Sequence, residues 1–350
     1  MRCEEGDCYE VGVCLVVVKK CGCNMAILNK TFLKNILPDI VIKCFKKSMY
    51  IFFRGYFLLD VYRRRYTSIF NVDVLCKELN YVTPEYGFNG FYGHYRVMKK
   101  IFDLPARIVL NASIEHGLYV NDGFEEIEIR PKVIFTMSEM RRSLLMEKLK
   151  NKIVISVGPY IQYVNDIYKP KKMKSIKRML GKTLLVFPSH SSNDIEVSYD
   201  IEEFIKEINT IANENNFSTV LVCVYWRDYL DGNCKAFLDE GYKLCSAGHA
   251  YDSFFLDRLK TIINLSDVVM ANKFGTHMGY VVSMGKPYYL YKQRSREMRI
   301  YTDDGKIEYD EDVEWIRLFE KEALDLFGIY SEVLNEKQLK FIRKYWGNWN

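Results

Sequence analysis

The chain has 350 residues, 49% of them hydrophobic and 27% charged, which is typical of a folded globular protein and excludes a disordered or fibrous one. Its formal net charge of +5 is small for this length and lies mostly in short local runs, so it indicates no nucleic-acid partner. The length exceeds that of one ordinary core and predicts two α/β domains.

Cysteines are concentrated near the start of the chain. Seven of the ten precede residue 77, and no Cys-x-x-Cys pair occurs among them, so we expect reduced thiols rather than a zinc site or disulfides. These seven are Cys3, Cys8, Cys14, Cys21, Cys23, Cys44 and Cys76. The apolar run at residues 13–18 is too short for a signal sequence and predicts a buried strand.

The most hydrophobic window, residues 50–62, is interrupted by Arg54 and Asp60. It falls short of the about 20 mostly apolar residues that cross a bilayer. Lys46 and Lys47 precede it and residues 63–65, all Arg, follow it. We expect a buried strand with solvated basic ends, while contact with a membrane surface is the alternative that stays open.

The remainder of the first half predicts an α/β acceptor-side lobe in residues 1–168. Its expected elements are a helix from about Ser138 to Lys150 and strands at residues 107–111, 132–136 and 152–157. The basic stretch 169–182 follows, with Pro170 and Gly181 near its ends. This composition predicts a solvated linker.

In the second half, short apolar strands alternate with amphipathic helices, which predicts a doubly wound, Rossmann-like lobe over residues 183–310. Its strands are expected at residues 183–187, 219–225, 242–246, 268–271 and 287–291. Its helices are expected from Asp200, which forms a capping box with Glu203, and at residues 252–265 and 275–284. Residues 311–350 predict two C-terminal helices, near 312–327 and 331–346.

All five histidines stand beside Gly, Ser or Thr, in expected loops or at element ends. If the histidines served only to pack the core, we would expect at least one of them on the apolar face of a helix. We therefore expect three or more of them to line one cleft. They are His94, His116, His190, His249 and His277.

The segment Asn-Lys-Phe-Gly-Thr-His-Met-Gly directly follows an expected strand and opens a helix. Unpaired amides and the helix dipole bind phosphate at such a junction. Gly275 would let the backbone approach a ligand, and Thr276 and His277 can donate to phosphate oxygens. Asn272 and Lys273 complete the expected site. The alternative is an N-capped helix in which Thr276 only caps and His277 is half-buried.

Two more loops follow strands of the same expected sheet. One has the sequence Pro-Ser-His-Ser-Ser and the other Ala-Gly-His-Ala-Tyr-Asp. Hydroxyls and imidazoles there can hold a phosphate or a sugar hydroxyl, and three loops at one edge are stronger evidence than any single loop. The residues expected at this site are Ser189, His190, Ser191, Gly248 and His249.

The first half offers a candidate base. Glu115 and His116 adjoin each other after an expected strand, and either could take a proton from an acceptor hydroxyl. The alternative is a structural Glu–His pair in a turn. The aromatic, glycine-rich loop at residues 86–94 predicts either an acceptor site that stacks on sugar or a packed surface loop. Its candidate acceptor residues are Asn89, Tyr92 and His94.

Several chemistries lack their motifs. The sequence has no Gly-x-x-x-x-Gly-Lys-Ser/Thr, Gly-x-Gly-x-x-Gly, His-Glu-x-x-His or Gly-x-Ser-x-Gly. Kinases, NAD dehydrogenases, zinc proteases and serine hydrolases therefore lose their main support. No Asp-x-Asp stands at a strand end, so we expect no metal site.

The ordered segments Ser-Ile-Glu-His-Gly, Val-Gly-Pro-Tyr-Ile, Val-Phe-Pro-Ser-His-Ser, Gly-His-Ala-Tyr-Asp and Phe-Gly-Thr-His-Met-Gly-Tyr carry a family resemblance. From about Asn89 to Tyr291 the chain resembles bacterial polysaccharide-biosynthesis glycosyltransferases of the GT-B type. That resemblance implies two Rossmann-like lobes with a cleft between them. It also implies metal-independent sugar transfer, without a cofactor, from a nucleotide-sugar donor to a glycan or lipid-linked acceptor in surface polysaccharide (capsule) synthesis.

The resemblance also implies roles for residues. Gly275, Thr276 and His277 would hold donor phosphate, and Glu115 or His116 would act as the base. Ser189, His190 and Ser191 would complete the donor pocket. The implied location is cytoplasmic, with peripheral contact at the inner face of the membrane left open.

Three readings remain possible on these residues. Besides the glycosyltransferase, the same fold would suit a nucleotide-sugar epimerase or a nucleotide-alcohol phosphotransferase. A catalytically silent subunit that binds glycan or nucleotide is the third. The donor's base and sugar, the acceptor and the stereochemical outcome are not specified by the sequence.

Overall fold

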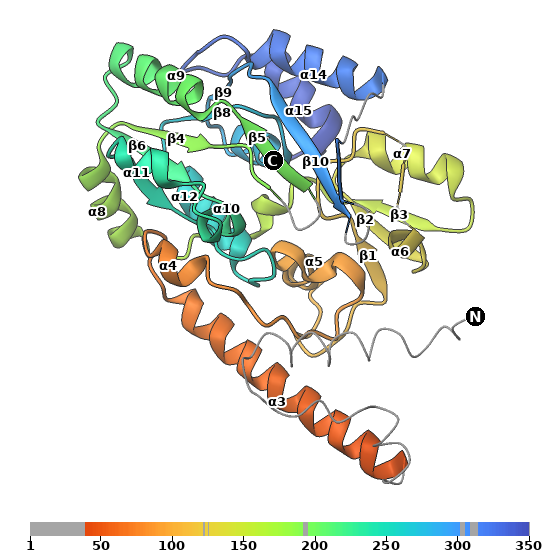
Figure 1. Ribbon diagram of the computed structural model, residues 1–350. Helices are drawn as coiled ribbons and strands as arrows, with labels where there is room; N and C mark the ends of the chain where they lie inside the picture. The colour runs from red at the N-terminus through yellow and green to blue at the C-terminus, as the bar shows by residue number, and fades with distance from the viewer. Residues whose placement is uncertain are drawn as a thin grey trace. The chain divides into compact units, whose positions relative to one another are not determined.

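The structure is a computed structural model that describes residues 39–121, 123–124, 126–191, 195–301, 305–308 and 314–349 (Figure 1). Its contacts divide the chain into two compact units. The first unit runs to Asp60 and includes Asn80–Thr83, and the second comprises Val61–Leu79 and Pro84–Asn350. The expected strand at residues 13–18 and the first five cysteines lie outside the described residues.

The hydrophobic window at residues 50–62 is helical, so the expected strand there is wrong. It forms part of α3 (Asp39–Arg65). Phe57, Val61 and Arg64 are buried at spacings of four and three residues, whereas Leu58, Leu59 and Tyr62 between them are exposed. Apolar residues occupy most positions of this window, so its helical period cannot be recognised from the sequence. It becomes visible only when the buried residues are known. Within the described ranges, every helix falls short of the length and apolarity that a membrane crossing requires.

The main sheet has five parallel strands in the order β7-β6-β4-β8-β9. Starting from β4, the chain adds β6 and β7 on one side and then β8 and β9 on the other. The expected doubly wound sheet is confirmed, with its switch point between β4 and β8. The strands are β4 (Thr183–Phe187), β6 (Thr219–Cys223), β7 (Lys243–Cys245), β8 (Val268–Ala271) and β9 (Tyr288–Leu290).

Both faces of the five-stranded sheet are buried. On β4, Leu184 and Val186 pack into one hydrophobic cluster, while Leu185 and Phe187 pack into another on the opposite face. Parallel sheets need this double cover because their connections place helices on both faces. The helices on the first face include α9 (Ile201–Glu214). Those on the second include α12 (Phe255–Leu265), α13 (Thr276–Ser283), α14 (Glu314–Phe327) and α15 (Glu336–Trp346).

A smaller sheet of three parallel strands, β1-β2-β3, is formed by the first half of the chain. Its elements are β1 (Ala112–Ile114), β2 (Val133–Thr136), β3 (Ile153–Ser156) and α7 (Glu139–Lys148), which packs against β3. The last three of these were expected. The expected strand at residues 107–111 is wrong, because a turn closed by Ile108 N and Pro105 O (3.0 Å) occupies that place.

The basic stretch at residues 169–182 is not a linker, because it contains α8 (Pro170–Leu180). Pro170 suits the first turn of a helix, and Gly181 ends the helix with a φ of +68°. Met173 and Leu180 lie on one face and pack against the core. The lysines on the remaining faces concealed this apolar spacing.

The two parallel sheets share a hydrophobic core. Ile114 and Phe135 of the three-stranded sheet belong to the same buried cluster as Leu185 and Val269 of the five-stranded sheet. Both sheets also lie in the second compact unit. The α/β class with parallel sheets is confirmed, whereas the division into two lobes stays a prediction.

Further elements lie between or beside these layers. A three-stranded antiparallel sheet, β11-β10-β5, does not appear among the sequence expectations. Its strands are β5 (Ile195–Tyr199), β10 (Ser295–Tyr301) and β11 (Gly305–Glu308). The remaining helices are α4 (Val72–Leu75), η1 (Gly87–Gly93), α5 (His94–Ile101), α6 (Glu126–Ile129), η2 (Tyr160–Tyr163), α10 (Trp226–Leu230) and α11 (Lys235–Asp239).

Candidate functional site

A cavity of about 400 Å³ lies at the carboxyl edge of the five-stranded sheet. Segments that directly follow β4, β6, β7 and β8 contribute to its wall, among them Ser189, Tyr225, Ala247 and Gly275. Open α/β sheets bind their ligands at this edge, beside the switch point. The volume falls in the range of small-molecule sites.

Four of the five histidines line this cavity, which we call the histidine cavity. His190 and His277 come from loops of the five-stranded sheet, His94 begins α5, and His116 follows β1. The expectation that three or more share one cleft is confirmed. The predicted site residues in its wall are Tyr92, His94, His116, Ser189, His190, Lys273, Gly275, Thr276 and His277.

The start of α13 forms one wall of the histidine cavity. Gly275 is its N-cap, and a side chain there would meet Nδ1 of His277 at 3.1 Å. Nε2 of His277 lies 2.9 Å from the Tyr288 hydroxyl. Burial lowers the pKa of His277 to about 3.

Thr276 joins the two parallel sheets. Its Oγ1 accepts a hydrogen bond from Leu118 N at 3.0 Å, and its carbonyl accepts one from Trp346 Nε1 at 3.0 Å. The loop after β1 is therefore fixed against the start of α13. Although the hydroxyl oxygen accepts this bond, its hydrogen can still be donated to a phosphate, alongside the first-turn amides of the helix.

Asn272 and Ser191 lie beside the cavity rather than in its wall. Oδ1 of Asn272 accepts hydrogen bonds from Ser189 N at 2.7 Å and Ser189 Oγ at 2.9 Å. Oγ of Ser191 accepts from Val197 N at 3.1 Å. Both side chains are buried and hold the loop after β4 in place.

Gly248 and His249 pack against buried residues of the core. A side chain at Gly248, which has a φ of +99°, would meet Nη2 of Arg258 at 2.8 Å. That guanidinium is fully buried in an ion pair with Asp252, 2.6 Å long. The ring of His249 packs on Trp226 with centroids 4.0 Å apart. Neither predicted residue reaches the histidine cavity.

The aromatic loop before β1 contains both structural residues and a residue that lines the cavity. Asn89 is buried and extends the edge of β1, because its side chain donates to Ala112 O at 2.8 Å and accepts from Ile114 N at 2.9 Å. Tyr92 lines the cavity with a φ of +54°, an uncommon value for a residue with a side chain. Gly93 must be glycine, since a Cβ would lie 2.3 Å from Ser253 O. Such backbone outliers cluster at functional sites.

His94 is the most unusual polar group in the cavity wall. Its side chain is 1% exposed, and neither ring nitrogen has a hydrogen-bond partner among the described residues. Burial lowers its pKa to about 3. An unpaired buried polar group costs about 1–3 kcal/mol, so a histidine here indicates a use other than packing.

Glu115 does not line the cavity. Its Oε1 accepts hydrogen bonds from Nε and Nη2 of Arg141 at 2.8 and 2.5 Å, and the two side chains are 3% and 1% exposed. Burial raises the pKa of Glu115, although Arg141 opposes that shift. The remaining Arg141 donors bond to the carbonyls of Asn121 and Gly123. Glu115 is thus committed to a structural ion pair.

His116 faces the cavity and has a carboxylate partner that the sequence reasoning missed. Its Nδ1 lies 3.4 Å from the Tyr119 hydroxyl and 3.5 Å from Oε1 of Glu128, whose side chain is 3% exposed. Tyr119 donates to the same Oε1 at 2.6 Å and so holds the carboxylate. A carboxylate at Nδ1 orients the imidazole and leaves Nε2 for proton transfer. Glu128 lies twelve residues away in a short helix, so no local signal marks it.

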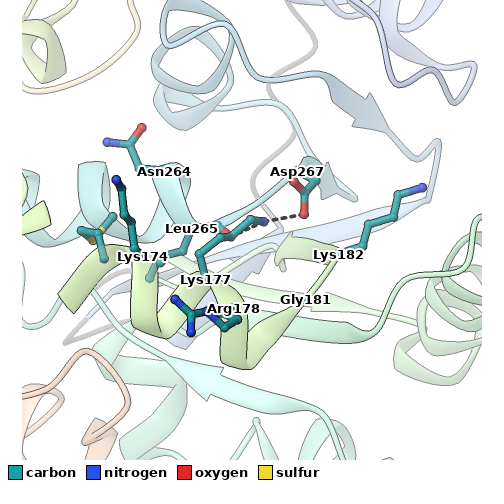
Figure 2. Close-up of a pocket in the computed structure, with 9 residues that line it drawn as sticks. Lys174, Lys177, Arg178, Gly181, Lys182, Asn264, Leu265 and Asp267 are labelled. Atoms are coloured by element: carbon teal, nitrogen blue, oxygen red, sulfur yellow. Dashed lines mark hydrogen bonds and ion pairs between the residues drawn. The ribbon is translucent and has the colours of Figure 1, made fainter. Parts of the chain in front are cut away.

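A second depression, of about 620 Å³, lies at the opposite edge of the sheet, beside the residues that precede β4 and β8 (Figure 2). Lys177 from α8 bonds there to Asp267 at 2.5 Å and to Leu265 O at 2.9 Å. Lys182 is engaged by Glu332 at 2.7 Å. Lys174 and Arg178 also line this depression. It nevertheless lies at the amino edge of the sheet, whereas open α/β sheets bind ligands at the carboxyl edge, so the histidine cavity is the stronger candidate.

No three His, Cys, Asp or Glu side chains within the described ranges lie close enough together to hold a metal ion. The described cysteines Cys76, Cys223, Cys234 and Cys245 are buried free thiols. Comparison with models of known protein families and with curated proteins finds no match for this chain.

Glu115→Gln should destabilise the fold. It leaves the buried Arg141 guanidinium without its counter-charge, which costs about 3 kcal/mol or more. The neighbouring His116→Gln, at a side chain that is 32% exposed, should cost less than about 1 kcal/mol. Urea unfolding compares the free energies. Equal stability of the two variants would contradict a structural role for Glu115.

His94→Phe should remove a source of acid sensitivity. The folded-state pKa of about 3 lies below the ordinary 6.5, so the stability that the neutral ring contributes is complete above pH 6.5 and is lost as the pH falls from 6.5 towards 3. At about pH 5 the loss is about 2 kcal/mol. Urea unfolding at about pH 7.5 and pH 5 measures it. Between these two pH values the unfolding free energy of His94→Phe should fall by about 2 kcal/mol less than that of the natural chain. An equal fall in both proteins would contradict a buried, neutral His94 ring.

Proposed function

We propose that this chain is a metal-independent glycosyltransferase that moves a sugar from a nucleotide-activated donor to a glycan or lipid-linked acceptor. The observation that carries the proposal is the meeting of His116, His94 and His277 in one cavity at the switch point. His116 follows a strand of the three-stranded sheet, His277 follows a strand of the five-stranded sheet, and His94 begins α5, so the three come from segments far apart in the sequence. A base on one wall and a phosphate site on the other suit group transfer from a phosphate.

The donor side rests on the start of α13. First-turn amides and the helix dipole there favour an anion, and Lys273 in the same wall adds a positive charge. As the bond between sugar and phosphate breaks, its electron pair goes to the phosphate oxygen. Donors fixed in place before the reaction stabilise that growing charge more than the ground state.

The acceptor side rests on His116 and Glu128. The acceptor hydroxyl gives its proton to Nε2 of His116 while its oxygen bonds to the anomeric carbon. Glu128 at Nδ1 stabilises the imidazolium that forms. This assignment gives the base role to His116 alone, because Glu115 is occupied by Arg141.

The proposal extends to a GT-B-like division of labour. The five-stranded sheet would supply the donor site and the three-stranded sheet the acceptor side, and the acceptor would be an intermediate of surface polysaccharide synthesis. A shared core and the bond from Leu118 N to Thr276 Oγ1 favour small loop movements over a wide opening of the cavity. Tyr92 and His94 are placed to contact the sugar or the acceptor.

A nucleotide sugar should raise the melting temperature of the purified chain. At about 100 times its dissociation constant a ligand adds about 2.7 kcal/mol to stability. A panel of nucleotide sugars and free nucleotides, read by differential scanning fluorimetry, tests this, with Lys273→Ala as the variant that should weaken donor binding. A panel without any shift would contradict the proposed donor site.

His116→Gln should lower kcat with the chosen donor by about a hundredfold or more, and Glu128→Gln by about tenfold to a hundredfold, with donor affinity unchanged. Glu126→Gln is the matched control, because Glu126 lies in the same short helix but its side chain is 85% exposed. Rates unchanged by both site variants would refute the base assignment. Donor binding by a chain that has no turnover would favour the silent binding subunit.

A further inference from the structure

Helix α3 presents an exposed apolar face that the proposed reaction does not use. Ile51, Leu58 and Tyr62 follow one another at spacings of seven and four residues, with Gly55 in the same row. Phe52 and Leu59 form an adjacent row. The exposed fractions of these five apolar side chains lie between 47% and 67%. A stripe of this kind is far from the scattered apolar exposure of ordinary surfaces.

Basic residues border this face. Lys47, Arg63 and Arg65 are exposed, and the helix contains two acidic residues, Asp39 and Asp60. Over its whole length α3 has seven Lys or Arg against two Asp, so its formal charge equals the +5 of the entire chain. The helix is therefore one of the strongly basic segments of the chain.

We infer that α3 binds the surface of a bilayer that contains anionic lipids, with its apolar face in the headgroup region. An interfacial helix combines an apolar face with Lys and Arg at its borders, and tyrosine rings favour the boundary between water and acyl chains. The helix is not apolar enough to cross a membrane, so it lies along the surface. The inference is independent of the reaction in the histidine cavity.

The charge distribution favours a bilayer over a second copy of the chain. Two copies packed through α3 would bring two helices of formal charge +5 together, and like charges repel. An anionic bilayer instead attracts the same residues, and the attraction weakens with added salt. The aromatic rings Phe52 and Tyr62 then leave water without needing a protein partner.

Co-sedimentation of the full chain with vesicles tests this inference. We expect binding to phosphatidylcholine vesicles with about one-third phosphatidylserine, little binding to phosphatidylcholine alone, and weaker binding at about 0.5 M than at about 0.1 M salt. The double variant Phe52→Ser with Leu58→Ser should lose at least about tenfold in binding. Lys47→Ser with Arg63→Ser should lose severalfold, and only on the anionic vesicles.

A matched control is available elsewhere on the chain. Ile329 and Val333 are 80% and 73% exposed, and Ile329→Ser with Val333→Ser should leave vesicle binding unchanged. Because all the altered side chains are exposed, circular dichroism should show the same folded content in each variant. Binding that is equal for neutral and anionic vesicles, or that survives the Phe52 and Leu58 substitutions, would overturn the inference. So would a lipid-free dimer that these two substitutions dissociate.

Discussion

Parallel strands must be buried on both faces, and all of their carboxyl ends must meet at one edge; the arrangement of this protein follows from that constraint. Residues of β4 alternate between two hydrophobic clusters, so helices are required on both faces. The helices in turn force the connecting loops to the ends of the strands. Four of those loops end at the same cavity, beside the point at which the strand order reverses. The three-stranded sheet closes this cavity because it shares the core of the larger sheet.

The buried polar groups are of two kinds, those that hold the fold together and those that line the cavity. Glu115 with Arg141 and Asn89 with β1 are held by hydrogen bonds inside the protein, and Arg258 forms a buried ion pair with Asp252. These groups fix loops, and they offer little to a ligand. His94 is the opposite case, since it is buried in the cavity wall with both nitrogens unpaired by described residues. Under the proposed function, a polar group of the donor or acceptor would offset this cost.

The sequence predicted the α/β class, the five strands of the parallel sheet with the main helices between them, and the convergence of histidines. Each of these rests on local signals: short apolar runs, capping residues, and glycine or serine next to histidine. It failed at α3 and α8, where dense aromatic or basic residues concealed the helical spacing of the buried ones. It also misplaced β1, whose edge depends on hydrogen bonds from the distant side chain of Asn89.

The sequence by itself determined which loops stand at the ends of strands, because strand period and turn residues act over a few neighbours. It could not determine which side chain in a loop faces the cavity. Glu115 and His116 are adjacent, yet one is held by Arg141 and the other turns to Glu128 and the cavity. His249 packs on Trp226 while His190 and His277 line the wall. These choices depend on partners that only tertiary packing brings within hydrogen-bonding distance, and so only the folded structure decided them.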